Sequence, residues 1–359
     1  MLYDKIIAWT FNLMLFGGDL ILLVGLVRSP KIRTALTAGA GLLGGSVLLA
    51  AVLGTNHFFV VRLIAYALFL HMPIVLIAAA FILWRQIPRF SVVLLALAGI
   101  VAAIAVDAFL VEPHWLMETR TTITSAKIQQ PLRVAIIADL QTDEFGEYER
   151  QVFRRCLEAE PDIILMAGDY LQIDGNDNWD RLRDQINSHL REINFSAPLG
   201  VYAVQGNIDH QLWVELFNGL PVNRILETKS IDSGPVRVTG LEVWDSFDRN
   251  LEIDASQKFH IVLGHAPDFA LGKINGDLLV AGHTHGGQVC LPLIGPLMTA
   301  SQVPRSWANG ITKFASDKTL IVSRGIGMER QSAPRLRFLC RPELVVVDVV
   351  PEQTQVAAK

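Results

Sequence analysis

The chain has 359 residues and a formal net charge of −4, with 51% hydrophobic and 18% charged residues. This length suits two domains better than one, and a typical soluble protein has about 25% charged residues. The acidic balance and the lack of a basic tract argue against a nucleic-acid partner. The three cysteines, Cys156, Cys290 and Cys340, are too few and too scattered for a disulfide framework or a CxxC zinc site.

Four apolar stretches fill the first part of the chain, where charged residues are sparse. They cover about residues 6–27, 35–54, 58–84 and 92–111, and a bilayer core of about 30 Å needs roughly 20 helical residues. Buried helices of a large soluble core are the alternative, but four long stretches with short loops favour membrane spans. The first stretch lacks a basic start and a cleavage site, which indicates an anchor. Residues 1–112 are therefore predicted to form a membrane domain of about four transmembrane helices.

The basic residues of the short loops predict an orientation. Lys and Arg occur in residues 28–33 and again at Arg85 and Arg89, whereas residues 55–57 have none. Loops rich in Lys and Arg stay in the cytoplasm. We therefore expect the N-terminus and everything after the fourth span to lie outside the cytoplasm.

Arg62 lies at the start of the third apolar stretch and could reach the interface, whereas Asp19, His71 and Asp107 lie further along their stretches. Such residues are costly at membrane depth, so we expect them to face the interior of the helix bundle or an interface. Asp107 is close enough to a span end to reach the headgroups. Gly41 and Gly45 have a spacing that permits close helix contact, although glycine is also simply common in membrane helices. The pattern leaves structural and functional roles open.

From about residue 131 the pattern changes to alternating strands and helices. Apolar runs that end in Gly or a polar residue are typical of strands buried on both faces, and polar periodic segments at about 148–159 and 179–193 are typical of helices. The runs are "LRVAIIAD" from Leu132, "DIILMAGD" from Asp162, "VYAVQGN" from Val201, "FHIVLGH" from Phe259 and "DLLVAGH" from Asp277. Residues 131–359 are thus predicted to form a layered α/β domain, joined to the membrane domain by a connector at 113–130.

Polar side chains follow each of these runs, at the end of a strand where open α/β sheets bind ligands. Two carboxylates, two amide oxygens and three imidazoles suit a pair of divalent cations, one Asp bridging them. The residues are Asp139, Gln141, Asp169, Asn207, His265, His283 and His285.

A resemblance to a known family rests on the segment "AGHTHGGQ" at residues 281–288. It resembles the signature of the calcineurin-like metallophosphoesterases, in the membrane-anchored bacterial branch, which similarly continues with "SRGIG" (residues 323–327) and "RPEL" (residues 341–344). The likeness covers roughly residues 112–349, and the spans are similar to those of transmembrane metallophosphoesterases. It implies an α/β fold of layered αββα type and two divalent metal ions, with Mn, Fe, Zn and Mg all open.

The resemblance also implies a role for each strand-end residue. Asp139 and His285 would bind the first metal and Asp169 would bridge the two. The second metal would be held by Asn207, His265 and His283. The implied chemistry is attack on phosphorus by a water activated between two cations.

Two positions depart from the family pattern. Gln141 stands where the first metal has a histidine, and it still offers an oxygen. Ile208 stands where the family has a histidine that helps the leaving group or steadies the phosphate. A leaving group that needs little protonation would tolerate this loss. His210 is the candidate catalytic donor in its place, and an exposed histidine at a helix start is the plainer interpretation.

The sequence therefore predicts a metal-dependent hydrolase of the bacterial inner membrane, its catalytic domain outside the cytoplasm. The expected substrate is a phosphate ester, either a phosphodiester or a pyrophosphate, of a lipid-linked or envelope molecule. Membrane lipid is the other expected partner, and no nucleic acid is expected. The alternative is a non-catalytic metal- or phosphate-binding sensor coupled to the spans. A transporter is disfavoured because the spans have few polar residues and no inverted repeat.

Overall fold

The computed structural model describes residues 2–173, 178–314 and 318–352. The chain divides into two compact units. The first comprises Met1–Val111 together with Glu329–Arg335, and the second comprises Glu112–Met328 and Leu336–Lys359. Each unit is described separately below.

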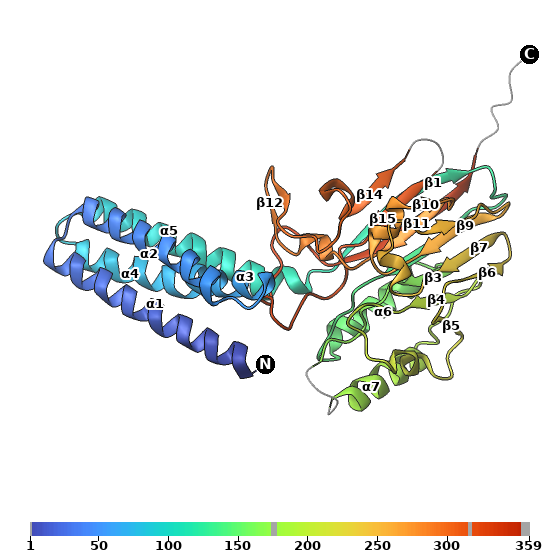
Figure 1. Ribbon diagram of the computed structural model, residues 1–359, viewed down its shortest axis with the longest axis horizontal. Coiled ribbons are helices and arrows are strands. Elements are labelled where there is room, and N and C mark those ends of the chain that lie inside the picture. The colour runs from blue at the N-terminus through green and yellow to red at the C-terminus, as the bar shows by residue number, and fades with distance from the viewer. Residues whose placement is uncertain (1, 174–177, 315–317, 353–359) are drawn as a thin grey trace, which may run out of the picture. The chain divides into compact units, whose positions relative to one another are not determined.

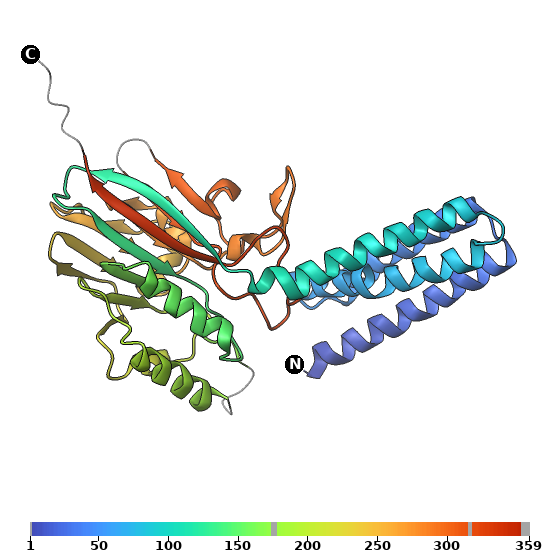
Figure 2. The same cartoon turned by 180° about the vertical axis from the view of Figure 1, so that it is seen from behind.

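The first unit consists of apolar helices, as predicted (Figures 1 and 2). Four uninterrupted helical stretches among the described residues are long and apolar enough to cross a membrane. Asn56 begins the third by accepting the Phe59 N–H, and Pro88 begins the fourth, where its missing N–H costs nothing. The elements are α1 (Leu2–Arg28), α2 (Ile32–Leu53), α3 (His57–Tyr66), π-helical η1 (Ala67–His71), α4 (Met72–Leu83), α5 (Pro88–Val106), π-helical η2 (Asp107–Val111) and the 3₁₀ turn η3 (Glu112–His114).

Two apolar clusters hold these helices together. One is centred on Leu26 and Leu83, and the other on Phe11 and Phe59. Gly41 and Gly45 do not mediate a helix contact, because a Cβ added at either would meet no heavy atom within 4 Å. Asp19 and His71 are buried together, whereas Asp107 is partly exposed.

A segment distant in sequence belongs to this unit. The guanidinium of Arg62 donates to the backbone carbonyls of Gln331 and Ala333 at 2.5 and 2.6 Å. Asn56 Nδ2 donates to Ser332 Oγ at 3.3 Å. Residues 329–335 are thus fixed to the start of the third stretch through their backbone.

The second unit contains two six-stranded sheets. The first has the order β1-β16-β2-β3-β4-β5 and the second β14-β15-β11-β9-β7-β6. The first comprises β1 (Met117–Ser125), β16 (Glu343–Pro351), β2 (Leu132–Ile137), β3 (Ile163–Met166), β4 (Val201–Val204) and β5 (Val222–Ile225). The second comprises β14 (Gly310–Lys313), β15 (Thr319–Val322), β11 (Leu278–Ala281), β9 (Phe259–Leu263), β7 (Val236–Gly240) and β6 (Lys229–Ser233). Short pairs β8 (Glu252–Ile253) with β10 (Lys273–Ile274), and β12 (Cys290–Leu291) with β13 (Gly295–Pro296), complete the strands.

The sheets pack face to face over a fully apolar core. Ile136 and Leu165 of the first sheet meet residues such as Ile261 and Val280 of the second. The outer face of the first sheet is covered by α6 (Glu147–Glu158) and α7 (Trp179–Glu192) (Figure 2). The outer face of the second packs against the 3₁₀ turn η6 (Pro267–Leu271). The layered α/β prediction is confirmed.

The five apolar runs are strands β2, β3, β4, β9 and β11, and the two polar periodic segments are α6 and α7. Their arrangement differs from one open sheet, because β2–β4 belong to the first sheet and β9 and β11 to the second. Residues 113–130, expected to be a connector, include β1, which pairs in parallel with β16 along nine residues. The C-terminal strand therefore lies between β1 and β2.

Candidate metal centre

The strands that precede the polar residues are parallel within each sheet. β2, β3 and β4 run side by side and deliver Asp139, Asp169 and Asn207 at their carboxyl ends. β9 and β11 do the same for His265 and His283. Because the two sheets are packed face to face, the carboxyl ends of both meet at one edge of the second unit.

The backbone at this edge is strained. Five of the seven predicted ligand residues have a positive φ, which costs a non-glycine residue about 1–3 kcal/mol and is concentrated at functional sites. The angles are 49° at Asp139, 38° at Gln141, 55° at Asp169, 69° at His283 and 48° at His285. Strands that turn sharply at their ends aim these side chains toward one another, and the surrounding core maintains the strain.

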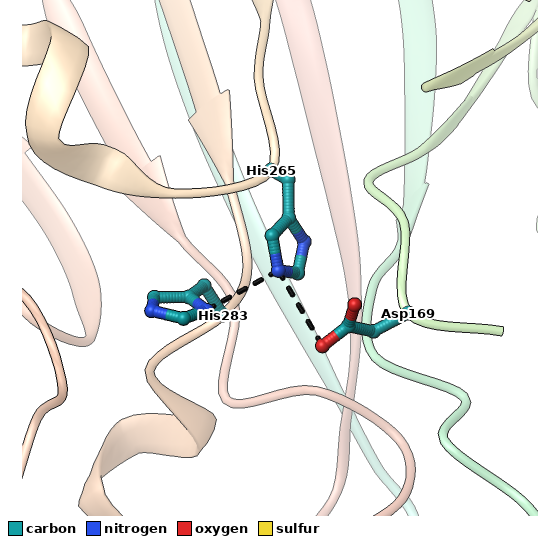
Figure 3. A group of neighbouring side chains, drawn as sticks. All are labelled: Asp169, His265 and His283. Atoms are coloured by element: carbon teal, nitrogen blue, oxygen red, sulfur yellow. Dashed lines mark hydrogen bonds and ion pairs between the residues drawn. The ribbon is translucent and has the colours of Figure 1, made fainter. Parts of the chain in front are cut away.

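His265 is the centre of the best-defined group (Figure 3). Its Nε2 lies 3.4 Å from Asp169 Oδ2, 3.2 Å from His283 Nδ1 and 2.9 Å from Asn207 Oδ1. Asp169, His265 and His283 offer ligand atoms that all lie within 4.8 Å of one another. Two ligands held at 2.0–2.1 Å from a tetrahedral ion are about 3.3 Å apart, so the spacing fits a metal ion.

The remaining ring nitrogens of these histidines are held by backbone carbonyls. His265 Nδ1 donates to Ala167 O at 2.8 Å, and His283 Nε2 donates to Ala300 O at 3.0 Å. Histidine ligands are commonly oriented in this way by a hydrogen bond from the nitrogen that does not bind metal. The geometry therefore presents His265 Nε2 and His283 Nδ1 toward the shared centre.

The site without metal holds protons that a cation would displace. Burial lowers the pKa of His265, but the neighbouring Asp169 and Asp139 carboxylates outweigh it and raise the pKa to about 9. Burial and the charge of His265 lower the pKa of His283 to about 4. His265 therefore carries two protons and donates from Nε2, while His283 Nδ1 accepts. A divalent cation at this point would take over the role of the Nε2 proton.

Asp139 is held close to His265 and His283. Both of its carboxylate oxygens accept the backbone N–H of His283 at 2.9 Å. Its Oδ1 also lies 3.8 Å from His265 Nδ1. Burial raises the pKa of Asp139 to about 7. A fully buried carboxyl with so high a pKa is another indication that a positive charge belongs here.

The other two first-metal candidates are buried in the same region. Gln141 donates its backbone N–H to Asp169 O at 2.8 Å, and its side-chain Nε2 donates to Gln172 Oε1 at 3.1 Å. His285 Nδ1 is buried with no hydrogen-bond partner among the described residues. Burial, followed by the Arg337 guanidinium, lowers the pKa of His285 to about 3, so the ring is neutral and can act as a ligand.

Asp209 has a structural role that the sequence pattern did not assign. Its carboxylate accepts the backbone N–H groups of Asp169 at 2.9 Å, Tyr170 at 2.7 Å and Gly206 at 2.7 Å. Burial and the charge of Asp169 raise its pKa to about 7. It therefore fixes the turn that carries Asp169 against the turn that carries Asn207, and its position directly after "GNI" was the available signal.

The "SRGIG" and "RPEL" segments support Asp139. Gly327 N donates to Asp139 O at 2.7 Å, and a Cβ added at Gly325 would lie 2.8 Å from that of Asp139. The buried Glu343 of "RPEL" accepts the Arg324 N–H at 3.1 Å and Arg324 Nη2 at 2.8 Å. Gly325 and Gly327 thus hold Asp139 in place, and Glu343 fixes the adjacent Arg324.

Ile208 and His210 lie beside the ligands. Ile208 donates its backbone N–H to Asp169 Oδ1 at 3.2 Å, and its side chain is partly exposed. The His210 ring stacks on Trp179 with centroids 4.5 Å apart, and its Nδ1 accepts the Leu212 N–H at 3.2 Å. His210 precedes the 3₁₀ turn η4 (Trp213–Phe217) rather than an α-helix.

Comparisons with known proteins agree with this geometry. The family model "Calcineurin-like phosphoesterase" matches residues 132–287. The chain is 30% identical to the uncharacterized metallophosphoesterase YkuE of Bacillus subtilis, covering 66% of this chain and 86% of that protein. It is 26% identical to the phosphodiesterase YaeI of Escherichia coli, over 67% and 90% of the two chains. It is 22% identical to the UDP-2,3-diacylglucosamine pyrophosphatase LpxG of Chlamydia muridarum, over 60% and 83%.

Proposed function

The chain belongs to the calcineurin-like phosphoesterase family, and we propose that it is an active hydrolase that cleaves phosphodiester or pyrophosphate bonds of a lipid-linked substrate. Its relatives include a phosphodiesterase and a pyrophosphatase, and the family implies metal ions. The observation that carries the proposal is the group around His265, where three ligand atoms approach one nitrogen at 2.9–3.4 Å. A decayed site would have no reason to keep this spacing or the strained turns that create it.

Each ligand residue has a proposed role in holding two cations. Asp139, Gln141 and His285 would hold one, Asp169 would bridge, and Asn207, His265 and His283 would hold the other. When bound, the cations supply an activated water and offset the charge that develops on phosphorus. The chain's own contribution is to keep His265 and His283 in the correct tautomer and to hold Asp169 rigidly through Asp209.

Ile208 bears on the choice of substrate. An isoleucine side chain can neither donate a proton to a leaving alcohol nor bind the phosphate. Phosphate and activated alcohols leave without such help, which favours pyrophosphates and activated diesters over alkyl monoesters. His210 is the alternative donor, although its stacking on Trp179 gives it a structural role as well.

An apolar hairpin next to the centre supports a lipid-linked substrate. Residues 289–303 contain no charged residue, and the hairpin of β12 and β13 exposes Leu293 fully and Ile294 by 58%. It is tied to the metal centre at Gly287, where an added Cβ would lie 2.3 Å from Pro296 Cβ. A contiguous exposed apolar surface commonly marks a site for lipid or protein. The first unit has four helical stretches that are long and apolar enough to span a membrane, which is where such a substrate would be found.

The decisive experiment is hydrolysis of bis-(p-nitrophenyl) phosphate by the purified full-length protein after treatment with a chelator and addition of Mn²⁺, Fe²⁺, Zn²⁺ or Mg²⁺. We expect metal-dependent turnover that is lost in Asp169→Asn and His283→Ala, with metal content reduced in both. Asp254→Asn, at an exposed position away from the centre, is the matched control. Near-normal rates in both centre variants would remove the dinuclear proposal.

The sensor alternative gives a different result in the same experiment. A non-catalytic module would bind metal through the same residues and show no turnover with any cation. The lipid assignment has its own test, because Leu293→Asp should slow hydrolysis of a lipid pyrophosphate in vesicles while leaving the soluble diester unaffected. Equal losses on both substrates would show that the hairpin acts only by supporting the centre.

A further inference from the structure

A buried polar group lies within the first unit, far in sequence from the metal centre. His71 Nδ1 is 2.6 Å from Asp19 Oδ2, and His71 Nε2 is 3.1 Å from Asn12 Oδ1. Asp19 and His71 are 6% and 8% exposed. His71 closes the π-helical turn Ala67–His71, and such turns are frequent at functional sites in helices.

The hydrogen bonds determine how many protons this group holds. Asn12 Nδ2 donates to Ala8 O at 2.7 Å, so its Oδ1 is the atom that faces His71 and it can only accept. His71 Nε2 must therefore carry a proton. One further proton lies between His71 Nδ1 and Asp19 Oδ2, whichever atom it is bonded to. The pair of Asp19 and His71 consequently has no net charge.

One carboxylate oxygen of Asp19 accepts no hydrogen bond from the described residues. Asp19 Oδ1 is buried and has no hydrogen-bond partner among the described residues. A carboxylate oxygen left unsatisfied in an apolar environment destabilises the protein, because the hydrogen bonds it makes with water in the unfolded chain are not replaced. This oxygen lacks a hydrogen-bond donor, and its surroundings indicate where the donor would come from.

Asp19 lines a partly enclosed cavity of about 300 Å³ between α1, α2, α4 and α5. This volume is at the lower end of the range of small-molecule sites. Asp19, His71 and Ser46 are its polar lining residues, and the rest of the lining is apolar. Leu36, Leu43 and Leu97 lie at its rim and are 60, 54 and 44% exposed. The helices are apolar enough to span a membrane, so this rim faces lipid.

We propose that the cavity binds a long-chain alcohol, a single apolar chain whose hydroxyl group donates to Asp19 Oδ1. The apolar walls accept the chain, and the exposed rim admits it from the surrounding lipid. An uncharged donor is favoured because the Asp19–His71 pair is already neutral, and an ammonium group would leave an uncompensated charge at this depth. Water alone could satisfy the oxygen but would not fill an apolar space of this size.

The test uses the full-length protein in phosphatidylcholine nanodiscs and a decanol probe that carries a diazirine and a terminal alkyne. After photolysis, labelled peptides are mapped by mass spectrometry. We expect labelling to be concentrated on the cavity-lining residues of α1, α2, α4 and α5, above that of residues on the same helices that do not line it. 1-Decanol should compete about tenfold better than 1-methoxydecane, because the ether keeps the chain and loses the donor.

Two variants separate the hydroxyl site from the space around it. Asp19→Leu should abolish the preference for 1-decanol over the ether. Gly39→Leu should abolish labelling and leave the polar pair intact, because Gly39 lines the cavity and an added Cβ meets no heavy atom within 4 Å. Gly99→Leu and Asp107→Leu are the matched controls, since neither residue lines the cavity, and both should behave as wild type.

Several outcomes would overturn the proposal. Labelling spread evenly over all spans would show that the probe only reports lipid contact. Equal competition by alcohol and ether in the wild type would show that Asp19 does not bind the hydroxyl group. Unchanged labelling in a folded Gly39→Leu protein would exclude the cavity itself. Helix content measured by far-ultraviolet circular dichroism, together with the melting temperature of each variant in nanodiscs, serves as the folding control.

Discussion

The pH dependence of stability in the metal-free protein should report His265 directly. The pKa of this histidine is raised from 6.5 to about 9 in the folded state by Asp169 and Asp139, against the effect of burial. A histidine with a raised pKa stabilises the fold fully below pH 6.5, and this contribution is lost as the pH rises through 9. After removal of metal, the melting temperature should therefore fall between pH 6.5 and pH 9.

The size of the effect follows from the shift. A change from 6.5 to about 9 corresponds to about 3 kcal/mol at 1.36 kcal/mol for each pH unit. The side chain is completely buried, so solvent screening does not reduce this value. For a domain of this size, 1 kcal/mol shifts the melting temperature by roughly 2–4 °C. The expected fall is therefore about 6–12 °C across this range.

Most neighbouring groups titrate below this window. The Cys340 thiol acts inside it in the opposite sense, because its hydrogen bond with Cys290, followed by the Arg337 and Arg324 guanidinium groups, lowers its pKa to about 7. His283 and His285, with pKa values of about 4 and 3, act between those values and 6.5. Asp139 and Asp209 act between 3.8 and about 7. Comparison of wild type with His265→Gln isolates the contribution of the histidine together with its effect on Asp139, Asp169 and His283, because its charge lowers the pKa values of all three.

The assay is thermal unfolding followed by circular dichroism with chelator at pH 6.5 and pH 9, repeated with saturating Mn²⁺. Metal should reverse the trend, because binding requires deprotonated His265 and strengthens as the pH rises. His265→Gln should show a smaller fall than wild type without metal and little response to Mn²⁺. Identical pH slopes in wild type and His265→Gln would refute the assignment of the raised pKa.

Three further predictions concern the centre and the spans. Ile208→His should raise hydrolysis of alkyl monoesters at least tenfold, which is part of the roughly 10²–10⁴-fold that general acid help supplies, and leave activated diesters unchanged. Equal loss on both substrates in kinetic assays would show that Ile208 is structural. Gly206→Ala should lower kcat about 100-fold, because the new Cβ would lie 2.0 Å from Asp169 Oδ1 and displace that carboxylate, and a displacement of 1 Å costs about that much in rate. Unchanged metal content and an unchanged rate would contradict this contact. A C-terminal alkaline phosphatase fusion should be active and a C-terminal fluorescent-protein fusion dark, because the basic loops at 28–33 and 85–89 predict a C-terminus outside the cytoplasm. The reverse pattern would overturn that orientation.

The local properties of the chain were sufficient to predict the helical stretches of the first unit, two helices of the second unit and the five strands that carry the candidate ligands, but not strands such as β1 and β16. Helical stretches of the first unit follow from uninterrupted apolar sequence, and strands β2, β3, β4, β9 and β11 follow from short apolar runs that end in Gly or a polar residue. Both signals depend on neighbouring residues only. The choice of Asp, Asn and His at the strand ends was visible for the same reason, so the list of candidate ligands could be written before their geometry was known.

Tertiary structure decided how those residues act, because their partners are distant in sequence. The carbonyl that orients His265 belongs to Ala167, 98 residues earlier, and Asp209 secures the Asp169 turn across 40 residues. No periodicity encodes such pairs: the Asp209 pair arises where β4 lies beside β3 in the first sheet, and the Ala167 pair arises where the two sheets pack and bring their strand ends to one edge. The Asp19–His71 pair is a similar case: hydropathy indicates that both residues are costly in a membrane, and only the packing of α1 against η1 shows that each offsets the cost of the other.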